Sequence, residues 1–297
     1  MAPGPIAPVV AGAITGAGGE LVDLDEAEAL VWTDAAGAAE LAELLPTLPR
    51  IRWVQLPFAG VDRFAGMFDD GRTWTSTKGA YSEPVAEHAL ALGLAGLRGL
   101  PARSRAREWG PQGGTRLAGA PVTVLGGGGI TEAFLRLVAP FGVEATVVRR
   151  HPSPVAGAVR VVGSEELHAV LAGAKLILVA LALTAETAGI IGAAELERMD
   201  GDAWLVNVGR GAHVVTDDLV AALRAGAIGG AALDVTEPEP LPAGHPLWDL
   251  DNCLITPHTA NTWQMAEPLF AERVGVNVAR YQRHEPLLGL IDAKLGY

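Results

Sequence analysis

Cysteine, positive charge and long apolar runs are all scarce in this sequence. The single cysteine, Cys253, cannot form an intramolecular disulfide and lacks the partners of a cysteine-based metal site. The sequence has 22 basic and 34 acidic side chains, and the resulting net charge of -12 would repel a polyanion. The longest strongly apolar run, residues 176–183, is much shorter than the roughly 20 residues that cross a bilayer. We therefore expect no nucleic-acid partner, no metal site and no membrane span.

Basic residues are also missing from the start of the chain. The first one is Arg50, whereas leader peptides carry early Lys or Arg, so we expect a cytoplasmic protein. With 49% hydrophobic and 19% charged residues, the 297 residues can bury a sizeable core and are numerous enough for two domains. A disordered or fibrous protein is excluded.

Short apolar runs alternate with helical patterns from about residue 122 onward. The runs lie at residues 122–126, 144–149, 175–181, 203–209, 229–235 and 252–258. Near-continuous apolar strands are typical of a parallel sheet that is buried on both faces. A helical stretch at residues 216–227, with Thr216 as its expected N-cap, illustrates the segments between them. The alternation predicts an α/β fold with a doubly wound parallel sheet, as in a Rossmann dinucleotide-binding domain.

The N-terminal third is less regular. Candidate strands lie at residues 28–34 and 50–57, with a candidate helix at residues 38–48 between them. An apolar helix expected at residues 85–100 would lead into the nucleotide domain, and a long one at residues 262–284 could return to the first unit. We therefore predict a dinucleotide-binding domain over residues 97–261. Residues 1–96 and 262–297 are predicted to form a smaller, discontinuous, flavodoxin-like α/β domain.

The first chemical motif is GGGGIT, at residues 126–131, where a strand ends and a helix begins. Gly126 permits a tight turn, Gly128 lets the backbone approach a pyrophosphate, and the helix N-terminus offers unpaired N–H groups. Thr131 stands where the dinucleotide fingerprint has its third glycine. A glycine turn without a ligand is the alternative.

The second motif follows the next strand, where NAD-binding sites usually place an acidic residue. This strand instead ends in Arg149, Arg150 and His151. Two cations would attract a 2′-phosphate, and no carboxylate is present there to bind the ribose hydroxyl. NADP is favoured, with NAD as second choice, although a solvated basic loop is the alternative.

The third motif spans residues 206–262 and resembles the signature region of the D-isomer-specific 2-hydroxyacid dehydrogenases. This is the family of glyoxylate/hydroxypyruvate reductase and phosphoglycerate dehydrogenase. The resemblance extends more loosely to the glycine turn and to LALTAETAGIIG, VAEHALAL and FAGVD, whereas the first fifty residues match poorly.

The resemblance implies a role for each matching residue. Arg210 in VGRG would orient the substrate, Glu239 in TEPEP would pair with the histidine, and His258 in TPH would donate the proton. Ala59 and Gly60 of FAGVD would bind the substrate carboxylate through their backbone N–H groups. The positions implied for the cofactor are Gly126, Gly128, Gly129, Ile130, Thr184, Val208, Asp234 and His258, with Arg149 and Arg150 added by the second motif.

Carbonyl reduction requires these residue types independently of the family. Hydride addition builds negative charge on the ketone oxygen, and a guanidinium can bind both that oxygen and a carboxylate. The oxygen must also gain a proton, which suits a histidine whose charged form is favoured by a carboxylate. Singly, Arg210 could be a surface charge, Glu239 part of an acidic turn and His258 a core histidine. Their joint occurrence after strand ends favours catalysis.

The sequence also departs from the family. Thr131 could loosen the cofactor turn, and Ala182 replaces a frequent proline. Phe58, Lys78 and Tyr81 fall where commoner members carry Ser, Pro and Asn, which puts the shape and charge of the substrate pocket in doubt. Formate dehydrogenases of this fold have glutamine at the position of Glu239, so that branch is disfavoured.

We therefore predict an NADP(H)-preferring oxidoreductase that reduces a small 2-oxo acid, of the glyoxylate or hydroxypyruvate type, to a D-2-hydroxy acid. The resemblance also implies a homodimer, with residues 85–109 near the interface. It further implies that the domain of residues 1–96 and 262–297 is a substrate-binding lid, with the active site in the cleft between the domains. One alternative is a dinucleotide-sensing regulatory protein with little turnover. Another is a reductase of carbonyls that lack a carboxylate, for which Arg210 would not be needed.

Overall fold

The computed structural model describes residues 7–34, 36–68 and 71–293. The chain forms two compact units, one of Ser82–Ala260 and the other of Met1–Tyr81 together with Asn261–Tyr297. The sequence suggested divisions after residues 96 and 261. The first division lies earlier because helix α3 (Ser82–Leu97) packs its buried residues into the core of the nucleotide unit.

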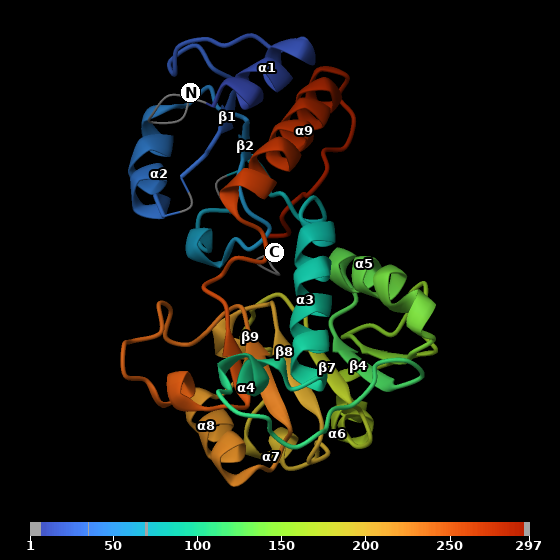
Figure 1. The fold of residues 1–297 in the computed structure, drawn as a ribbon. Helices are drawn as coiled ribbons and strands as arrows, with labels where there is room; N and C mark the ends of the chain where they lie inside the picture. The colour runs from blue at the N-terminus through green and yellow to red at the C-terminus, as the bar shows by residue number, and fades with distance from the viewer. Residues whose placement is uncertain (1–6, 35, 69–70, 294–297) are drawn as a thin grey trace. The chain divides into compact units, whose positions relative to one another are not determined.

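The nucleotide unit is built on a seven-stranded parallel sheet (Figure 1). Its strands are β4 (Pro121–Leu125), β5 (Glu144–Val148), β6 (Arg160–Val162), β7 (Leu176–Val179), β8 (Trp204–Asn207), β9 (Gly230–Leu233) and β10 (Cys253–Ile255). Their order is β10-β9-β8-β7-β4-β5-β6, and every pair is parallel. The chain starts at β4 in the middle, winds to one edge, then returns to β7 and winds to the other. This confirms the doubly wound sheet.

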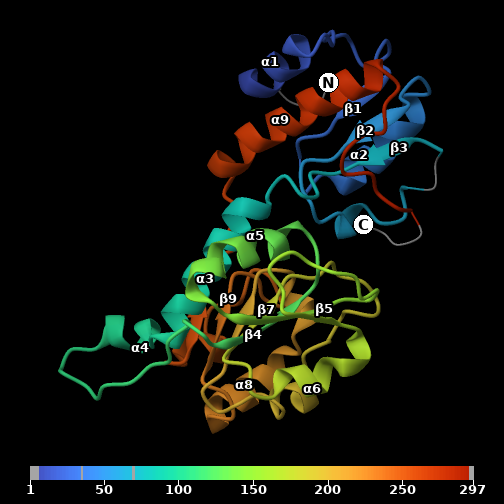
Figure 2. The same ribbon diagram turned by 90° about the vertical axis from the view of Figure 1, so that its right-hand side faces the viewer.

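Helices cover both faces of this sheet. Helices α3 and α5 (Gly129–Val138) lie on one face, and α6 (Leu167–Leu171), α7 (Ala193–Leu196) and α8 (Thr216–Ala225) lie on the other (Figures 1 and 2). Helix α3 approaches closely because it carries glycines at the contact. A Cβ atom on Gly96 would come within 2.2 Å of the Trp204 ring.

Two local features of the nucleotide unit differ from the expectations. Strand β6, at the edge of the sheet, has no counterpart among the predicted strands. Val215, and not Thr216, is the N-cap residue of α8; Thr216 is the first helical residue, and its hydroxyl donates to the Glu237 carbonyl at 2.6 Å. The Thr216 side chain therefore ties the start of α8 to the loop that carries Glu239.

The second unit has a three-stranded parallel sheet, in the order β1 (Ala29–Val31), β2 (Trp53–Gln55), β3 (Thr73–Thr75). Helix α9 (Trp263–Gln282) packs beside α1 (Pro8–Gly16), and α2 (Ala38–Leu44) contributes Leu41 to a second hydrophobic cluster (Figure 2). Buried Asn277 of α9 donates to the side-chain oxygen of Gln55 at 2.9 Å. The C-terminal helix is thus bonded to the N-terminal sheet.

None of the helices in the described part of the chain has both the length and the apolarity needed to cross a membrane. Another short helix of the nucleotide unit, α4 (Leu100–Arg105), begins a stretch in which residues 102–114 are all exposed.

Candidate active site

Most of the predicted site residues follow strands of the nucleotide unit. The glycine turn follows β4, Arg210 follows β8, Asp234 follows β9 and His258 follows β10. The carboxyl ends of parallel strands lie at the same edge of a sheet, which is where open α/β sheets bind ligands. The topology therefore places these residues together at the carboxyl-terminal end of the parallel strands.

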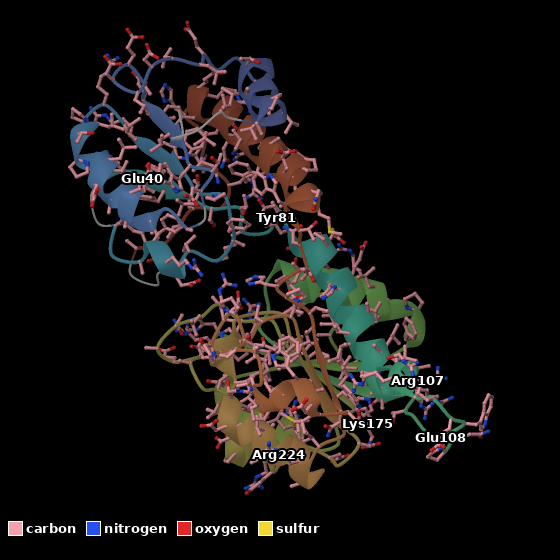
Figure 3. All side chains as sticks on the ribbon, turned by 60° about the vertical axis from the view of Figure 1, so that its left-hand side comes forward. Glu40, Tyr81, Arg107, Glu108, Lys175 and Arg224 are labelled. Carbon is pink, nitrogen blue, oxygen red and sulfur yellow. The ribbon has the colours of Figure 1, made fainter. Side chains whose placement is uncertain are left out.

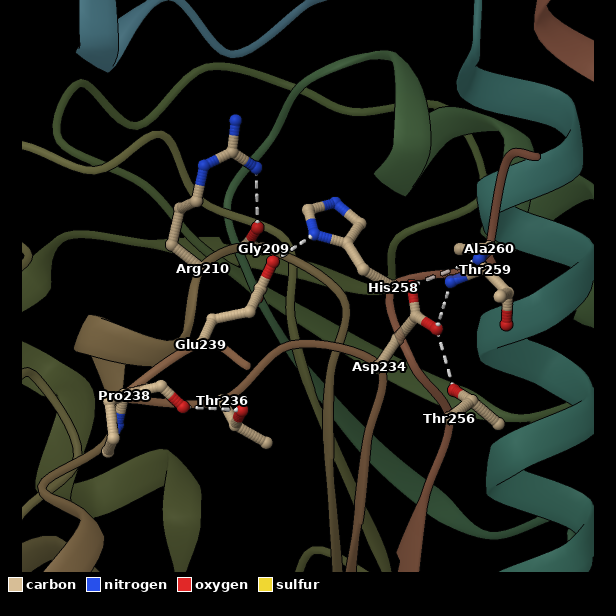
Figure 4. Close-up of polar contacts among 10 residues, drawn as sticks. All are labelled: Gly209, Arg210, Asp234, Thr236, Pro238, Glu239, Thr256, His258, Thr259 and Ala260. Carbon is tan, nitrogen blue, oxygen red and sulfur yellow. Dashed lines mark hydrogen bonds and ion pairs between the residues drawn. The ribbon is translucent and has the colours of Figure 1, made fainter. Parts of the chain in front are cut away.

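The Glu239 carboxylate and the His258 imidazole are in direct contact. The His258 Nδ1 atom lies 2.8 Å from Glu239 Oε1, and the two side chains are 49% and 38% exposed (Figure 4). Figure 4 shows the Arg210 side chain on the same side of the loops as the imidazole. The pair is therefore accessible to a small molecule and oriented through Nδ1.

Two buried side chains fix the backbone of the Arg210 turn. Asn207, at the end of β8, accepts from the Gly209 N–H at 3.0 Å and donates to the Arg210 carbonyl at 2.9 Å. His213 Nδ1 accepts from the Arg210 N–H at 3.0 Å, and the Arg210 guanidinium donates to the Gly209 carbonyl at 2.8 Å. Gly211 lets the turn pack on the next loop, because a Cβ there would lie 2.0 Å from the Thr236 carbonyl.

Asp234 lies beneath His258 and bonds the turn that carries it. Its side chain is 1% exposed, and it accepts from the Thr256 hydroxyl at 2.6 Å and from the Thr259 and Ala260 N–H groups at 2.8 and 3.0 Å (Figure 4). Burial acts to raise the pKa of the Asp234 carboxyl, but these bonds and one from His88 outweigh it and lower the pKa to about 2. Asp234 is therefore a buried anion.

The glycine turn has the shape that a bound pyrophosphate needs. Gly126 has a φ of 110°, and a Cβ on it would lie 2.3 Å from the Ala180 carbonyl oxygen. In the described part of the chain, no side chain caps the N-terminus of α5. Thr131 is fully buried and donates its hydroxyl to the Gly126 carbonyl at 2.8 Å. The threonine thus bonds the turn to the helix.

The arginines after β5 differ in their surroundings. The Arg149 side chain lies across Gly127, since a Cβ on that glycine would be 2.9 Å from its Cδ atom. Arg150 is exposed and forms an ion pair with Glu186. Arg149 is therefore held at the glycine turn, whereas Arg150 has a carboxylate partner.

Ala59 and Gly60 belong to the other unit, in the loop after β2. Two buried hydroxyls bind the carbonyl of the preceding Pro57, that of Thr77 at 3.1 Å and that of Tyr81 at 2.6 Å. Burial raises the pKa of Tyr81 to about 12, so it remains a hydrogen-bond donor at physiological pH. The start of this loop is thus anchored by the segment that follows β3.

A comparison with protein families gives a match over this region. The sequence model of the D-isomer specific 2-hydroxyacid dehydrogenase, NAD binding domain, matches residues 89–260, more than half of the chain. The chain belongs to this family. It is therefore an oxidoreductase of the 2-hydroxyacid dehydrogenase type, and the resemblance noted in the sequence is confirmed.

Three relatives of this dehydrogenase cover nearly its whole length. A protein of Corynebacterium melassecola, described only by its position beside proB, is 36% identical over 96% of this chain and 95% of its own. A 2-hydroxyacid dehydrogenase from Xanthobacter autotrophicus Py2, in complex with NADPH and MES, is 30% identical with a TM-score of 0.85, covering 99% of this chain and 96% of that one. An NADPH-dependent glyoxylate/hydroxypyruvate reductase from Sinorhizobium meliloti, in complex with NADP and sulfate, is 25% identical with a TM-score of 0.81, covering 97% and 96%.

The structure brings some of the predicted residues of this dehydrogenase into contact and leaves others apart. Glu239 and His258 touch, and Asp234 bonds the same turn. Val208 is buried directly after β8, and Thr184 lies in the loop after β7, where its N–H donates to the Thr187 hydroxyl at 2.8 Å. In the described part of the chain, no hydrogen bond or ion pair joins either of them to the Glu239–His258 pair.

Three polar residues of this dehydrogenase were not singled out from the sequence. Asn207 and His213 hold the Arg210 turn, and His88 of α3 contacts Asp234 and Thr256. A polar residue inside an apolar strand or helix, as at Asn207 and His88, is the only signal that the sequence offers for them.

Proposed function

We propose that this dehydrogenase reduces a small 2-oxo acid, of the glyoxylate or hydroxypyruvate type, to a D-2-hydroxy acid with NADPH as the preferred cofactor. The contact between His258 Nδ1 and Glu239 Oε1, at 2.8 Å, carries the proposal. An imidazole oriented by a carboxylate through one nitrogen can give a proton from the other. Two solved relatives, one in complex with NADPH and one with NADP, support the choice of cofactor.

The residues at the glycine turn fit a dinucleotide phosphate. Gly128 caps α5 in an extended conformation, so the N–H groups of Gly129 and Ile130 begin the helix at its positive end. Arg149 across Gly127, with Arg150 next to it, places cations beside the turn for a 2′-phosphate. When bound there, NADPH supplies the hydride for the reaction.

The remaining steps belong to side chains of this protein. Arg210 orients the 2-oxo acid, because a guanidinium can bind the carboxylate and the reacting carbonyl together, and it stabilises the charge that develops on the oxygen. His258 donates the proton to that oxygen, and Glu239 holds the imidazole through Nδ1. The Ala59 and Gly60 N–H groups bind the substrate carboxylate.

The test is turnover with a panel of 2-oxo acids, followed as loss of NADPH absorbance with catalytic amounts of protein. His258→Ala should lower kcat by about 10² to 10⁴, the usual contribution of a positioned general acid, while NADPH binding measured by fluorescence stays near normal. Glu239→Gln keeps the size of the side chain and removes its charge, so its loss should be smaller. Wild-type turnover in His258→Ala would refute the assigned chemistry, and no turnover on any 2-oxo acid would refute the proposed function.

A further inference from the structure

A histidine outside the catalytic pair is bonded to the same turn. His88 lies on α3 with its side chain 23% exposed, and its Nε2 atom is 3.0 Å from the Thr256 hydroxyl oxygen and 3.3 Å from Asp234 Oδ1. Helix α3 is thereby connected to the segment after β10 that carries His258. Nothing in the proton transfer described above uses this side chain.

The direction of these bonds follows from the number of protons available. Thr256 has one hydroxyl proton, and it lies in the 2.6 Å bond to the Asp234 carboxylate, which can only accept. The Thr256 oxygen therefore accepts from His88, so the His88 Nε2 atom carries a proton. A chain of donors runs from His88 through Thr256 to Asp234.

Asp234, which receives these bonds, also forms hydrogen bonds with the backbone of the turn that carries His258. Its carboxylate accepts from the Thr259 and Ala260 N–H groups, and its carbonyl accepts from the His258 N–H at 2.8 Å. His258 has a φ of 52°, in the left-handed region that side chains with a Cβ rarely adopt. The surrounding bonds must hold this conformation, and those to Asp234 are adjacent to it on both sides.

We propose that His88 is a positioning residue that acts through Thr256 and Asp234 to hold the turn in which His258 meets Glu239. The effect on turnover rests on the proposed function, whereas the effect on the His258 imidazole does not. His88 touches neither the imidazole nor, in the proposed reaction, the substrate, so its action is indirect.

The experiment compares two substitutions at this position. His88→Leu removes the donor and keeps a side chain of moderate size, and His88→Gln keeps an N–H donor at a similar distance from the backbone. His168→Leu is the matched control, because His168 also contacts a carboxylate of this unit, Glu195 at 2.6 Å, on the opposite face of the sheet. Each variant is checked by thermal unfolding.

The first measurement is the imidazole NMR spectrum of the protein without cofactor, with the His258 signals assigned from a His258→Asn variant. We expect His88→Leu to shift or broaden the His258 signals, and His88→Gln and His168→Leu to leave them in place. The second measurement separates kcat from KM. His88→Leu should lower kcat by about tenfold with KM for the 2-oxo acid within about twofold, because the proton donor is misplaced while the substrate contacts remain.

Unchanged His258 signals in a folded His88→Leu protein would overturn the proposal, as would equal effects of His88→Leu and His168→Leu. If His88→Leu fails to fold, Thr256→Val removes the hydroxyl that links His88 to Asp234 and leaves only their 3.3 Å contact, so it must still shift the His258 signals. A wild-type protein without turnover refutes the proposed function alone, because the NMR comparison is still informative.

Discussion

Because the Asp234 carboxylate is buried, the free energy of unfolding of the nucleotide unit should depend on pH in the acidic range. Its pKa in the fold is about 2, against an ordinary value of 3.8. A lowered carboxyl pKa stabilises the fold above the unfolded value and stops doing so as the pH falls through the folded one. We therefore expect a contribution of about 2 kcal/mol that is complete above about pH 4 and lost toward pH 2.

Asp234→Asn tests this contribution, because it keeps the shape of the side chain and removes its charge. The free energy of unfolding in urea should fall at pH 7, and the loss of stability between pH 4 and pH 2 should be smaller than in wild type. Asp249→Asn, at an exposed carboxylate of the same unit, serves as the control. Equal acid dependence in wild type and Asp234→Asn would refute the argument.

In the proposed function, the two arginines after β5 select the cofactor, and their surroundings predict different contributions. Arg149 lies across the glycine turn, whereas Arg150 must leave an exposed ion pair with Glu186, which is worth only about 0 to 1 kcal/mol. Replacing both by Ala should lower kcat/KM for NADPH at least about tenfold more than for NADH, since each charge-assisted contact contributes roughly 1.5 to 3 kcal/mol.

The same measurement with Glu186→Gln should raise the preference for NADPH, because Arg150 loses its competing partner. Equal losses with both cofactors in the double alanine variant would show that the 2′-phosphate is not bound here.

Single site residues could be predicted from the sequence where a residue type that suits the reaction also follows a predicted strand. Glu239 and His258 are distant from each other in the chain but follow strands β9 and β10, and their residue types suit one reaction. His213 and Asn207 could not be predicted, because each acts by bonding a backbone group of the Arg210 turn. Such roles depend on the local path of the chain, which residue type and spacing do not specify.

Among the structural elements, the turn between β4 and α5 shows how a departure from the fingerprint is accommodated. Thr131 fills the place of a glycine and uses its hydroxyl to bond the Gly126 carbonyl at 2.8 Å. Removing a buried donor leaves its acceptor unsatisfied and costs about 1 to 3 kcal/mol. Thr131→Gly should therefore lower both the stability of the protein and its affinity for NADPH, although it restores the fingerprint.

Thr123→Val is the matched control for this prediction. Thr123 of β4 is also buried and donates to a backbone carbonyl, that of Val170, at 2.6 Å. Its loss should destabilise the fold in urea unfolding by a similar amount while NADPH titration stays unchanged. Tighter NADPH binding by Thr131→Gly would contradict the role given to the threonine.

The elements of the sheet were predictable because their runs are apolar on both faces. Five of the six predicted strands of the seven-stranded sheet are longer than the observed ones by one to four residues, as where residues 180–181 continue the apolar run after β7. The first, at residues 122–126, has the observed length but is displaced by one residue. Strand β6 was missed because it is short, lies at the edge and has a buried residue only at Val162. Edge strands lack the continuous burial that makes central strands recognisable.

For the whole molecule, composition correctly indicated two α/β units but placed their first division too late. Residues 82–97 are apolar nearly all round, a pattern that suits a helix connecting two units as well as a helix inside one. Its membership of the nucleotide unit depends on Gly93 and Gly96, which let it lie against Leu176 and Trp204. Close approach of this kind is a property of the packed structure.

We expect the dehydrogenase to form a homodimer through the exposed segment that begins in α4. Residues 102–114 are all exposed, Trp109 is 97% exposed, and Figure 3 shows Arg107 and Glu108 on a segment that projects from the nucleotide unit. A large apolar side chain exposed on a projecting segment suits an interaction surface, and the family resemblance implies a dimer interface near residues 85–109. We therefore expect a second copy of the chain to cover Trp109.

Light scattering after size exclusion should give twice the chain mass of 30.7 kDa at micromolar concentration. Trp109→Ser should shift the population toward the monomer, because burial of an aromatic side chain contributes strongly at an interface. Trp248→Ser, at a tryptophan of the same unit that is 46% exposed, should leave the mass unchanged. A wild-type monomer at tens of micromolar would refute the dimer, and equal effects of the two variants would place the interface elsewhere. NADPH titration distinguishes loss of assembly from loss of folding, since the glycine turn lies within one chain and should bind cofactor in the folded monomer.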